Sequence, residues 1–130
     1  MDATYSEFVD AGITRKIIGC AMEVHRELGP GLLESVYRQC LMRELELQGL
    51  LHVRELKVPI VYKGVELDCG FRADLVVNDS AVVEIKTVEQ LMPIHEAQLL
   101  TYLKLMKRRV GLLLNFNSTS LKHGIRRLVR

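Results

Sequence analysis

Tryptophan is absent from this sequence, and aromatic residues of all kinds make up only 5% of its 130 residues. A protein that relies on extensive base stacking needs more aromatic side chains than this. Long apolar runs are also absent, since no stretch approaches the roughly 18 residues that a membrane-spanning helix requires. The first ten residues have no basic region followed by an apolar stretch, so we expect no secretory signal. We therefore expect a protein that does not cross a membrane.

Cysteine is scarce as well. The three cysteines, Cys20, Cys40 and Cys69, form no CxxC or other pair at the spacing of metal ligands. An odd, scattered count is typical of reduced thiols in the cytoplasm rather than of a disulfide framework or a zinc site. The sequence also lacks a GxxxxGK[ST] phosphate-binding loop and a GxSxG nucleophile turn. These features favour a cytoplasmic protein that belongs to neither of those two motif classes.

What is present is an ordinary globular composition, with 48% hydrophobic and 26% charged residues. This length predicts one domain, residues 1–130, with a real core. The formal net charge of +2 conceals an asymmetry, because every Asp and Glu lies at or before Glu96. The basic residues beyond that point are Lys104, Lys107, Arg108, Arg109, Lys122, Arg126, Arg127 and Arg130. They form either a solvated basic face or a surface that binds a polyanion.

The first half of the chain predicts two helices followed by a strand. Apolar residues recur at helical spacing over residues 13–28 and again over residues 33–45, with Gly49 placed to end the second helix. Alternation then predicts a strand over residues 56–62, and Pro59 places that strand at a sheet edge because proline cannot donate to a ladder. A tight turn at Lys63-Gly64 leads into the next strand, with a bulge at Gly70.

The second half predicts a hairpin, a helix and two further strands. The hairpin spans residues 71–86, and a helix follows from Pro93 to about residue 108. The continuous apolar run at residues 110–116 is typical of a strand buried in a sheet, and residues 123–130 offer a last short strand. Strand, helix and strand in succession imply a parallel crossover. The predicted order is α-α-β-β-β-α-β-β, which describes one compact α/β domain.

Charged residues interrupt the hairpin. A two-residue turn would place Asp74 opposite Val83, whereas a three-residue turn at residues 78–80 would place it opposite Glu84. Opposed carboxylates, with Cβ atoms about 5 Å apart, need a proton or a cation between them. A divalent cation such as Mg²⁺ is one interpretation, and Lys86 would then lie beside the metal-bound water or a phosphate. The other is a cross-strand cluster on an exposed face, in which Arg72 and Lys86 pair with the two acids.

Two predicted helices add polar residues to this picture. Glu34 lies at the margin of the second helix's apolar stripe, where it is either a first-turn acid favoured by the helix dipole or a third carboxylate that points inward. On the third helix, Gln98 and Tyr102 share a face, with His95 one turn earlier. Such residues are either a buried tyrosine with polar neighbours or the lining of a phosphate site.

Together these residues resemble the PD-(D/E)XK nuclease superfamily, in which Asp74, Glu84-Ile85-Lys86 and the Gln98/Tyr102 pair have counterparts. The pair is similar to that of the bacterial recombination exonucleases. From Ile13 onward, the chain resembles the small stand-alone GxxExxY proteins of that superfamily. The matching segments are "VHRELGPGLLESVY", "VYKG", "FRADLVV", "EIK", "HEAQLLTYLKL" and "GLLLNF". The one departure is Ala73, which replaces the proline that names the motif.

The resemblance implies a restriction-endonuclease-like core, a mixed sheet in αβββαβ order flanked by helices. Asp74, Glu84 and the Ile85 carbonyl would ligate Mg²⁺ or Mn²⁺, and Glu34 would complete the acidic set. Lys86 would be the catalytic lysine. Gln98 and Tyr102 would orient the active site or the DNA backbone, and His95, one turn earlier on the same helix, is a further candidate for binding substrate.

The function expected from these residues is metal-dependent hydrolysis of phosphodiester bonds in DNA. A divalent ion can activate the water, neutralise the phosphoryl charge and assist the leaving oxygen. We expect contacts to the nucleic-acid backbone rather than to the bases. Two alternatives remain open at this stage: a non-catalytic module that binds nucleic acid or protein, and a subunit, homo-oligomeric or not, of a larger repair or defence complex.

Overall fold

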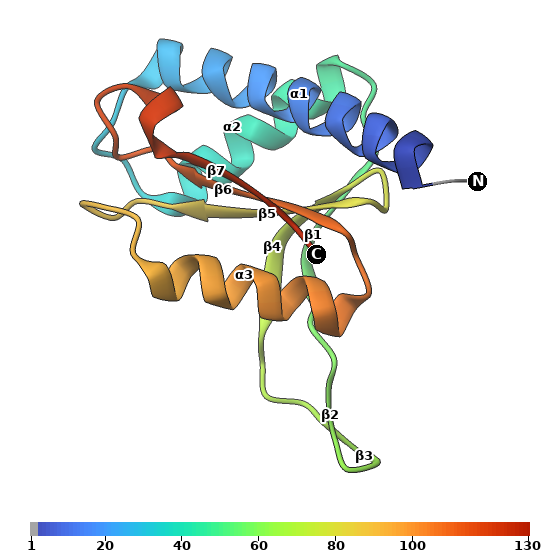
Figure 1. Ribbon diagram of the computed structural model, residues 1–130. Helices are drawn as coiled ribbons and strands as arrows, with labels where there is room; N and C mark the ends of the chain where they lie inside the picture. The colour runs from blue at the N-terminus through green and yellow to red at the C-terminus, as the bar shows by residue number, and fades with distance from the viewer. Residues whose placement is uncertain (1–2) are drawn as a thin grey trace.

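The computed structural model describes residues 3–130, with side chains from residue 11 onward. In this part of the chain, five strands form a mixed sheet in the order β1-β4-β5-β6-β7, with helices α1 and α2 on one face and α3 on the other (Figure 1). The helices are α1 (Ala3–Leu28), α2 (Glu34–Leu47) and α3 (Pro93–Met106). The strands of this sheet are β1 (His52–Lys57), β4 (Arg72–Val77), β5 (Ala81–Lys86), β6 (Val110–Asn115) and β7 (Ile125–Val129).

Each face of the sheet has its own apolar core. Helices α1 and α2 bury one cluster against the sheet, which includes Ile17, Ala21, Tyr37, Leu41, Leu75, Val83 and Leu112. Helix α3 buries the other, which includes Leu99, Leu103, Val76, Val82 and Leu113. Because successive strand residues point to opposite faces and both faces are covered, strand β6, between β5 and β7, is buried along its whole length. This confirms the prediction of a buried strand from its continuous apolar run.

The predicted order and crossover are confirmed. Strands β5 and β6 run parallel, and α3 connects them. Leaving aside the small sheet described below, the elements from α2 to β6 follow the order α-β-β-β-α-β. Helix α2 ends where predicted, with Gly49 in the left-handed region (φ 71°) and its N–H bonded to the Glu46 carbonyl. A 3₁₀ turn, η1 (Leu121–Gly124), precedes the last strand.

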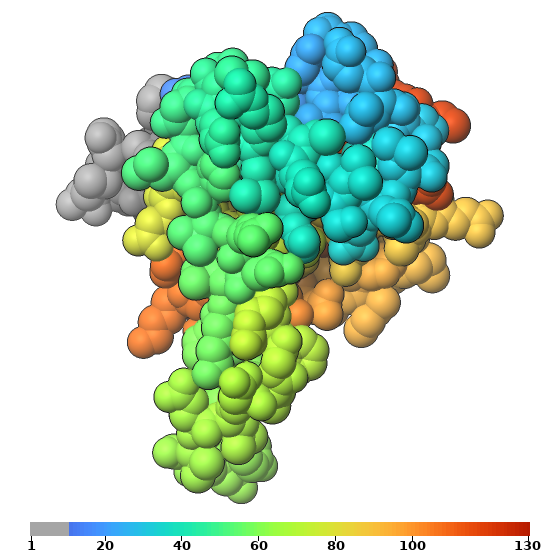
Figure 2. Space-filling model, turned by 180° about the vertical axis from the view of Figure 1, so that it is seen from behind, coloured from blue at the N-terminus to red at the C-terminus, as the bar shows by residue number. Residues whose placement is uncertain are grey.

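The predicted strand over residues 56–62 was wrong, because two strands occupy this region. Strand β1 ends at Lys57, and β2 (Ile60–Tyr62) pairs with β3 (Val65–Leu67) in a separate two-stranded sheet. This pair forms an arm that projects from the body (Figures 1 and 2). Pro59, which has no N–H, separates the strands, and β1 is an edge strand. The break at Pro59 thus redirects the chain into the arm.

Two smaller expectations also differ from the structure. Gly70 is not a bulge within a strand, because β3 ends at Leu67 and β4 begins at Arg72; it lies in the connection, with φ 76°. Helix α1 begins at Ala3, earlier than the predicted residue 13, since the prediction rested on an apolar spacing that starts at Ile13. The expectation about a secretory signal concerns the first ten residues, whose side chains lie outside the described part. No helix in that part is long and apolar enough to span a bilayer.

Candidate active site

The hairpin of β4 and β5 adopts the three-residue register. Leu75 pairs with Val83 and Val77 with Ala81, so Asn78 to Ser80 form the turn. Continuing this register by one residue sets Asp74 opposite Glu84, the second of the two arrangements that the sequence allowed. On its other side β4 pairs with β1, and the pairs on either side of Asp74 set it opposite Glu55. Three carboxylates therefore lie at one level on three adjacent strands.

Glu84 is the buried member of this group. Its side chain is only 5% exposed, and Oε1 is buried without a hydrogen-bond partner among the described residues. The pKa of Glu84 is raised to about 9, first by burial and then by the charge of Asp74 and a hydrogen bond with Asp74, while the charge of Lys86 opposes the shift. An unsatisfied buried acceptor of this kind is expensive. It is stabilised by a proton or by a cation.

Asp74 is tied to the neighbouring strand. Its Oδ2 accepts a hydrogen bond of 2.7 Å from the backbone N–H of Ile85. Arg72, which one interpretation of the sequence paired with Asp74, instead lies 3.8 Å from Asp68. Within the described part of the chain, no ion pair shorter than 4 Å joins Lys86 to either acid of the hairpin. A neutralised charge cluster on an exposed face is therefore not what the hairpin contains.

Both layers of helices reach this end of the sheet. Glu34, the first residue of α2, is exposed at the rim, and its pKa is raised by partial loss of hydration and by the charge of Asp74. On the opposite face, the pKa of Tyr102 from α3 is raised by burial and by the charges of Glu84 and Asp74. Lys86 lowers the pKa of both Glu34 and Glu84. The structure thus gathers these five predicted residues around one acidic centre.

The other two predicted substrate residues, Gln98 and His95, lie further from the carboxylates than Tyr102 does. Gln98 and Tyr102 line an apolar cavity of about 260 Å³ at the base of the arm, together with Phe71. The Phe71 and Tyr102 rings meet edge to face, with centroids 6.3 Å apart. His95 caps α3: its Nδ1 accepts a hydrogen bond of 2.8 Å from the Met92 N–H. The structure therefore gives His95 a local role at the helix terminus.

The segment between α1 and α2 fixes where Glu34 lies. The Tyr37 hydroxyl donates to the Gly29 carbonyl (2.5 Å) and accepts from the Leu32 N–H (3.1 Å). The Tyr37 ring stacks on Phe116 with centroids 4.6 Å apart. Gly31, with φ 102°, allows the chain to turn back within this short connection. The spacing of Gly31, Glu34 and Tyr37 thus fixes the position of the start of α2.

Strand β6 fixes the end of β5 in a similar way. The buried Asn115 side chain accepts a hydrogen bond from the Val88 N–H (3.1 Å) and donates one to the Val88 carbonyl (2.9 Å). The Phe116 N–H also donates to the Lys86 carbonyl (3.0 Å). These bonds therefore fix the backbone of Lys86 at the end of β5, next to the carboxylates.

Two charged residues of the site were missed by the sequence analysis. Arg38, on α2, lies 3.3 Å from Glu55 (Nη2 to Oε1) and 3.8 Å from Asp74 (Nη1 to Oδ1). The signal for Arg38 was its position one helical turn after Glu34. Glu55 had no comparable signal, because the predicted strand began one residue after it.

The donor set fits a hard divalent cation. No three Asp, Glu, His or Cys side chains within the described residues gather closely enough to hold a metal ion by themselves. Mg²⁺ commonly takes only one or two carboxylates and completes its shell with water or phosphate oxygens. Asp74 and the unpartnered Glu84 Oε1 supply such carboxylates, and the Ile85 carbonyl lies on the same strand.

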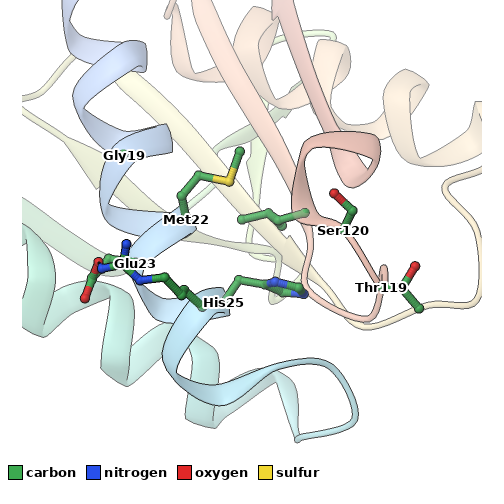
Figure 3. A pocket seen from close by; sticks show the side chains of 8 residues that line it. Gly19, Met22, Glu23, His25, Thr119 and Ser120 are labelled. Atoms are coloured by element: carbon green, nitrogen blue, oxygen red, sulfur yellow. The ribbon is translucent and has the colours of Figure 1, made fainter.

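Other cavities of the molecule differ in chemistry from this site. One of about 420 Å³ lies between α1 and the segment before η1 (Figure 3). There, His25 Nε2 lies 2.8 Å from the Ser118 carbonyl, and Glu23 pairs with Arg26. His25, Glu23 and Arg26 thus have partners within the chain. Among the described residues, the buried carboxylate oxygen without a hydrogen-bond partner is Oε1 of Glu84, at the carboxylate cluster.

A mixed sheet with carboxylates on neighbouring strands, and a lysine two residues beyond one of them, defines a nuclease-like α/β protein. A family model described as the PD-(D/E)XK nuclease superfamily matches residues 11–128, and the chain belongs to this superfamily. Its members are generally nucleases that act with divalent metal ions, which implies binding of nucleic acid. No curated protein and no solved structure matches the chain.

Proposed function

We propose that this protein is a nuclease of the GxxExxY branch of its superfamily, which hydrolyses phosphodiester bonds in DNA with Mg²⁺ or Mn²⁺. The observation that carries the proposal is the buried, unpartnered Oε1 of Glu84 beside Asp74. A structural acid in this position would have a donor. One without a donor is suited to a cation, which the superfamily uses for catalysis.

The residues have distinct roles in this proposal. Asp74, Glu84 and the Ile85 carbonyl hold the metal ion, and Glu34 approaches it from the rim, through water. When bound, the ion supplies the Lewis acid that lowers the pKa of water and neutralises the phosphoryl charge. Lys86 orients the attacking water and stabilises the negative charge that develops on the phosphoryl oxygens.

Substrate contacts are assigned to α3. Gln98 and Tyr102 bind the nucleic-acid backbone beside the carboxylates. His95, whose Nδ1 is occupied by the helix cap, retains only Nε2 for a phosphate. In this proposal residues 1–130 act as one domain in the cytoplasm.

The first test is calorimetric titration of Mg²⁺ and Mn²⁺ into the wild-type protein and into Asp74→Asn and Glu84→Gln. We expect binding to the wild type and its loss in both variants. Asp79→Asn is the matched control, because Asp79 is an acid of the same hairpin that is 86% exposed; it should bind metal as the wild type does. Cleavage of single- and double-stranded DNA and RNA is then compared with the bound metal.

Two results would overturn the proposal. Equal metal binding by the wild type and both site variants would place the cation elsewhere. No binding, even with an oligonucleotide present, would leave a module that binds nucleic acid or protein without catalysis as the better account. Cleavage that requires an added protein would favour a subunit of a larger complex.

A further inference from the structure

Two charged residues adjoin the carboxylates and have no part in the proposed metal site. Arg38 lies on α2 one turn after Glu34, so the two side chains share a helix face. Its guanidinium is 3.3 Å from Glu55 and 3.8 Å from Asp74, and only 21% of the side chain is exposed. A strong, permanent positive charge is therefore partly buried directly beside the acids that would hold the cation.

The contacts of Arg38 are incomplete. The 3.8 Å separation from Asp74 is too long for a hydrogen bond, so this contact is electrostatic only. Nε of Arg38 is buried, and no acceptor for it exists among the described residues. Guanidinium presents five N–H donors in a planar fork that matches carboxylate and phosphate oxygens. Buried Nε is out of reach of a ligand, but the Nη1 group, whose contact with Asp74 is longer than a hydrogen bond, is available to an acceptor from outside the chain.

Glu55 holds the guanidinium in this position at a cost in backbone conformation. It has φ 53°, in the left-handed region that residues other than glycine rarely adopt. It also lies opposite Asp74, a neighbour of the same charge. Strained conformations of this kind persist where the surrounding structure requires them, and they gather at functional sites. The contact that accounts for the strained backbone of Glu55 is the one of 3.3 Å with Arg38.

We propose that Arg38 binds a non-bridging phosphate oxygen of the nucleic-acid substrate at the carboxylate cluster, and that Glu55 is a positioning residue that holds the guanidinium there. This inference rests on the proposed function. In the absence of substrate, Arg38 offsets the charge of Asp74. With substrate bound, the phosphate becomes the acceptor for the Nη1 group, on the side of the cluster nearest β1, while Lys86 approaches from β5.

The test measures binding without cleavage. A fluorescently labelled oligonucleotide is titrated into proteins that all carry Lys86→Ala, in Mg²⁺ and over a range of salt concentrations. We expect Arg38→Ala to weaken binding about tenfold or more, and to lower the slope of log K against log salt by about one, since one phosphate contact is lost. Arg38→Lys should recover only part of the affinity, because an ammonium lacks the planar fork.

Arg43→Ala is the matched control. Arg43 lies on the same helix, is 67% exposed and pairs with Glu46 on the helix surface. It should bind the oligonucleotide within about twofold of the parent, as expected for an exposed ion pair. Glu55→Gln should weaken binding less than Arg38→Ala and leave the salt slope unchanged, because the guanidinium remains. Calorimetric affinity for Mg²⁺ should be unchanged or higher in Arg38→Ala.

The outcomes separate this inference from the proposed function. If Arg38→Ala matches Arg43→Ala in affinity and salt slope, Arg38 is only a structural ion pair and the inference is wrong, while metal binding and cleavage by the wild type stand. If the wild type binds neither metal nor oligonucleotide, both fail. Should Arg38→Ala not fold, Arg38→Lys decides: full wild-type affinity and an unchanged slope in an oligonucleotide titration would overturn the role of the guanidinium fork.

Discussion

The two ends of the β4–β5 hairpin carry charges of very different character. At the open end, Asp74, Glu84 and Lys86 are half-buried or buried, and Oε1 of Glu84 has no hydrogen-bond partner among the described residues. At the turn, Asp79 is 86% exposed and pairs with Arg108. These ends are about 17 Å apart, at about 3.3 Å per strand residue. One hairpin thus combines a costly arrangement of charges with an ordinary one.

The basic C-terminal third belongs in part to the ordinary end. Arg108 reaches Asp79, and Arg130 bonds through its N–H to the Arg109 carbonyl and through Nε to the Arg108 carbonyl. These residues lie at the turn, away from Lys86. The expected basic surface beside the carboxylates is therefore not formed by these three arginines. Among the described residues, the cation paired with Asp74 is Arg38, from an element outside that third.

The comparison teaches that charge alone does not identify the site. An ion pair with one exposed partner, such as Asp79 with Arg108, contributes about 0–1 kcal/mol to stability, although Nε of Arg108 is buried and has no acceptor among the described residues. A buried polar group without a partner costs about 1–3 kcal/mol, and more when charged. A fold retains such a cost where a ligand or a reaction compensates for it. The difference between the ends can be tested by matched substitutions.

The largest expected effect is on cleavage. Lys86→Ala should lower the rate by about 100-fold or more, the usual consequence of removing a group that stabilises transition-state charge. Metal and DNA binding should be largely retained, since Lys86 is not a metal ligand in the proposed site. Arg108→Ala should cleave within about twofold of wild type, because Arg108 pairs with Asp79 at the turn, the other end of the hairpin from the carboxylates. Cleavage at the wild-type rate by Lys86→Ala would remove this lysine from the mechanism.

A second test concerns stability against pH in the metal-free protein. The pKa of Glu84 is about 9 in the folded state, above its ordinary value of 4.5. Its contribution to stability is therefore fully present below about pH 4.5 and is lost as the pH rises through the folded pKa. Glutamine cannot ionise, so Glu84→Gln should flatten this fall and gain about 1–3 kcal/mol of stability at pH 9.

Urea unfolding with a chelator at pH 5, 7 and 9 measures this gain. Asp79→Asn should follow the wild-type curve, because its acid is exposed. A Glu84→Gln protein that loses stability in parallel with the wild type as the pH rises would show that the ionisation of Glu84 is not the source of the pH dependence. The contrast between the two ends of the hairpin would then be one of position only.

Much of the acidic centre could be predicted because strand geometry is local. The two-residue period and the turn length together set Asp74 opposite Glu84, and helical spacing placed Tyr102 near Gln98. Glu55 could not be found this way. It joins the site only because β1 begins at His52 and pairs with β4, and its neighbours along β1 show no alternation of burial. Pairing between distant segments, rather than any local pattern, brings it to Asp74.

The smallest expected effect concerns the segment that positions the open end. Tyr37→Phe keeps the ring stacked on Phe116 but removes the hydroxyl that joins Gly29 and Leu32. Leu32 is exposed and Gly29 is half-buried. Water can therefore replace part of what is lost, and the free energy of unfolding should fall by only about 1 kcal/mol.

Cleavage should nevertheless fall several-fold in Tyr37→Phe, because the start of α2 carries Glu34 and, one turn later, Arg38. Tyr62→Phe is the matched control: Tyr62 lies on the arm and is 63% exposed, so neither stability nor cleavage should change. Loss of stability without loss of cleavage would mean that the hydroxyl supports the fold alone. Loss of both, with unchanged affinity for Mg²⁺, would show that the segment before α2 sets the rim of the site and not its metal ligands.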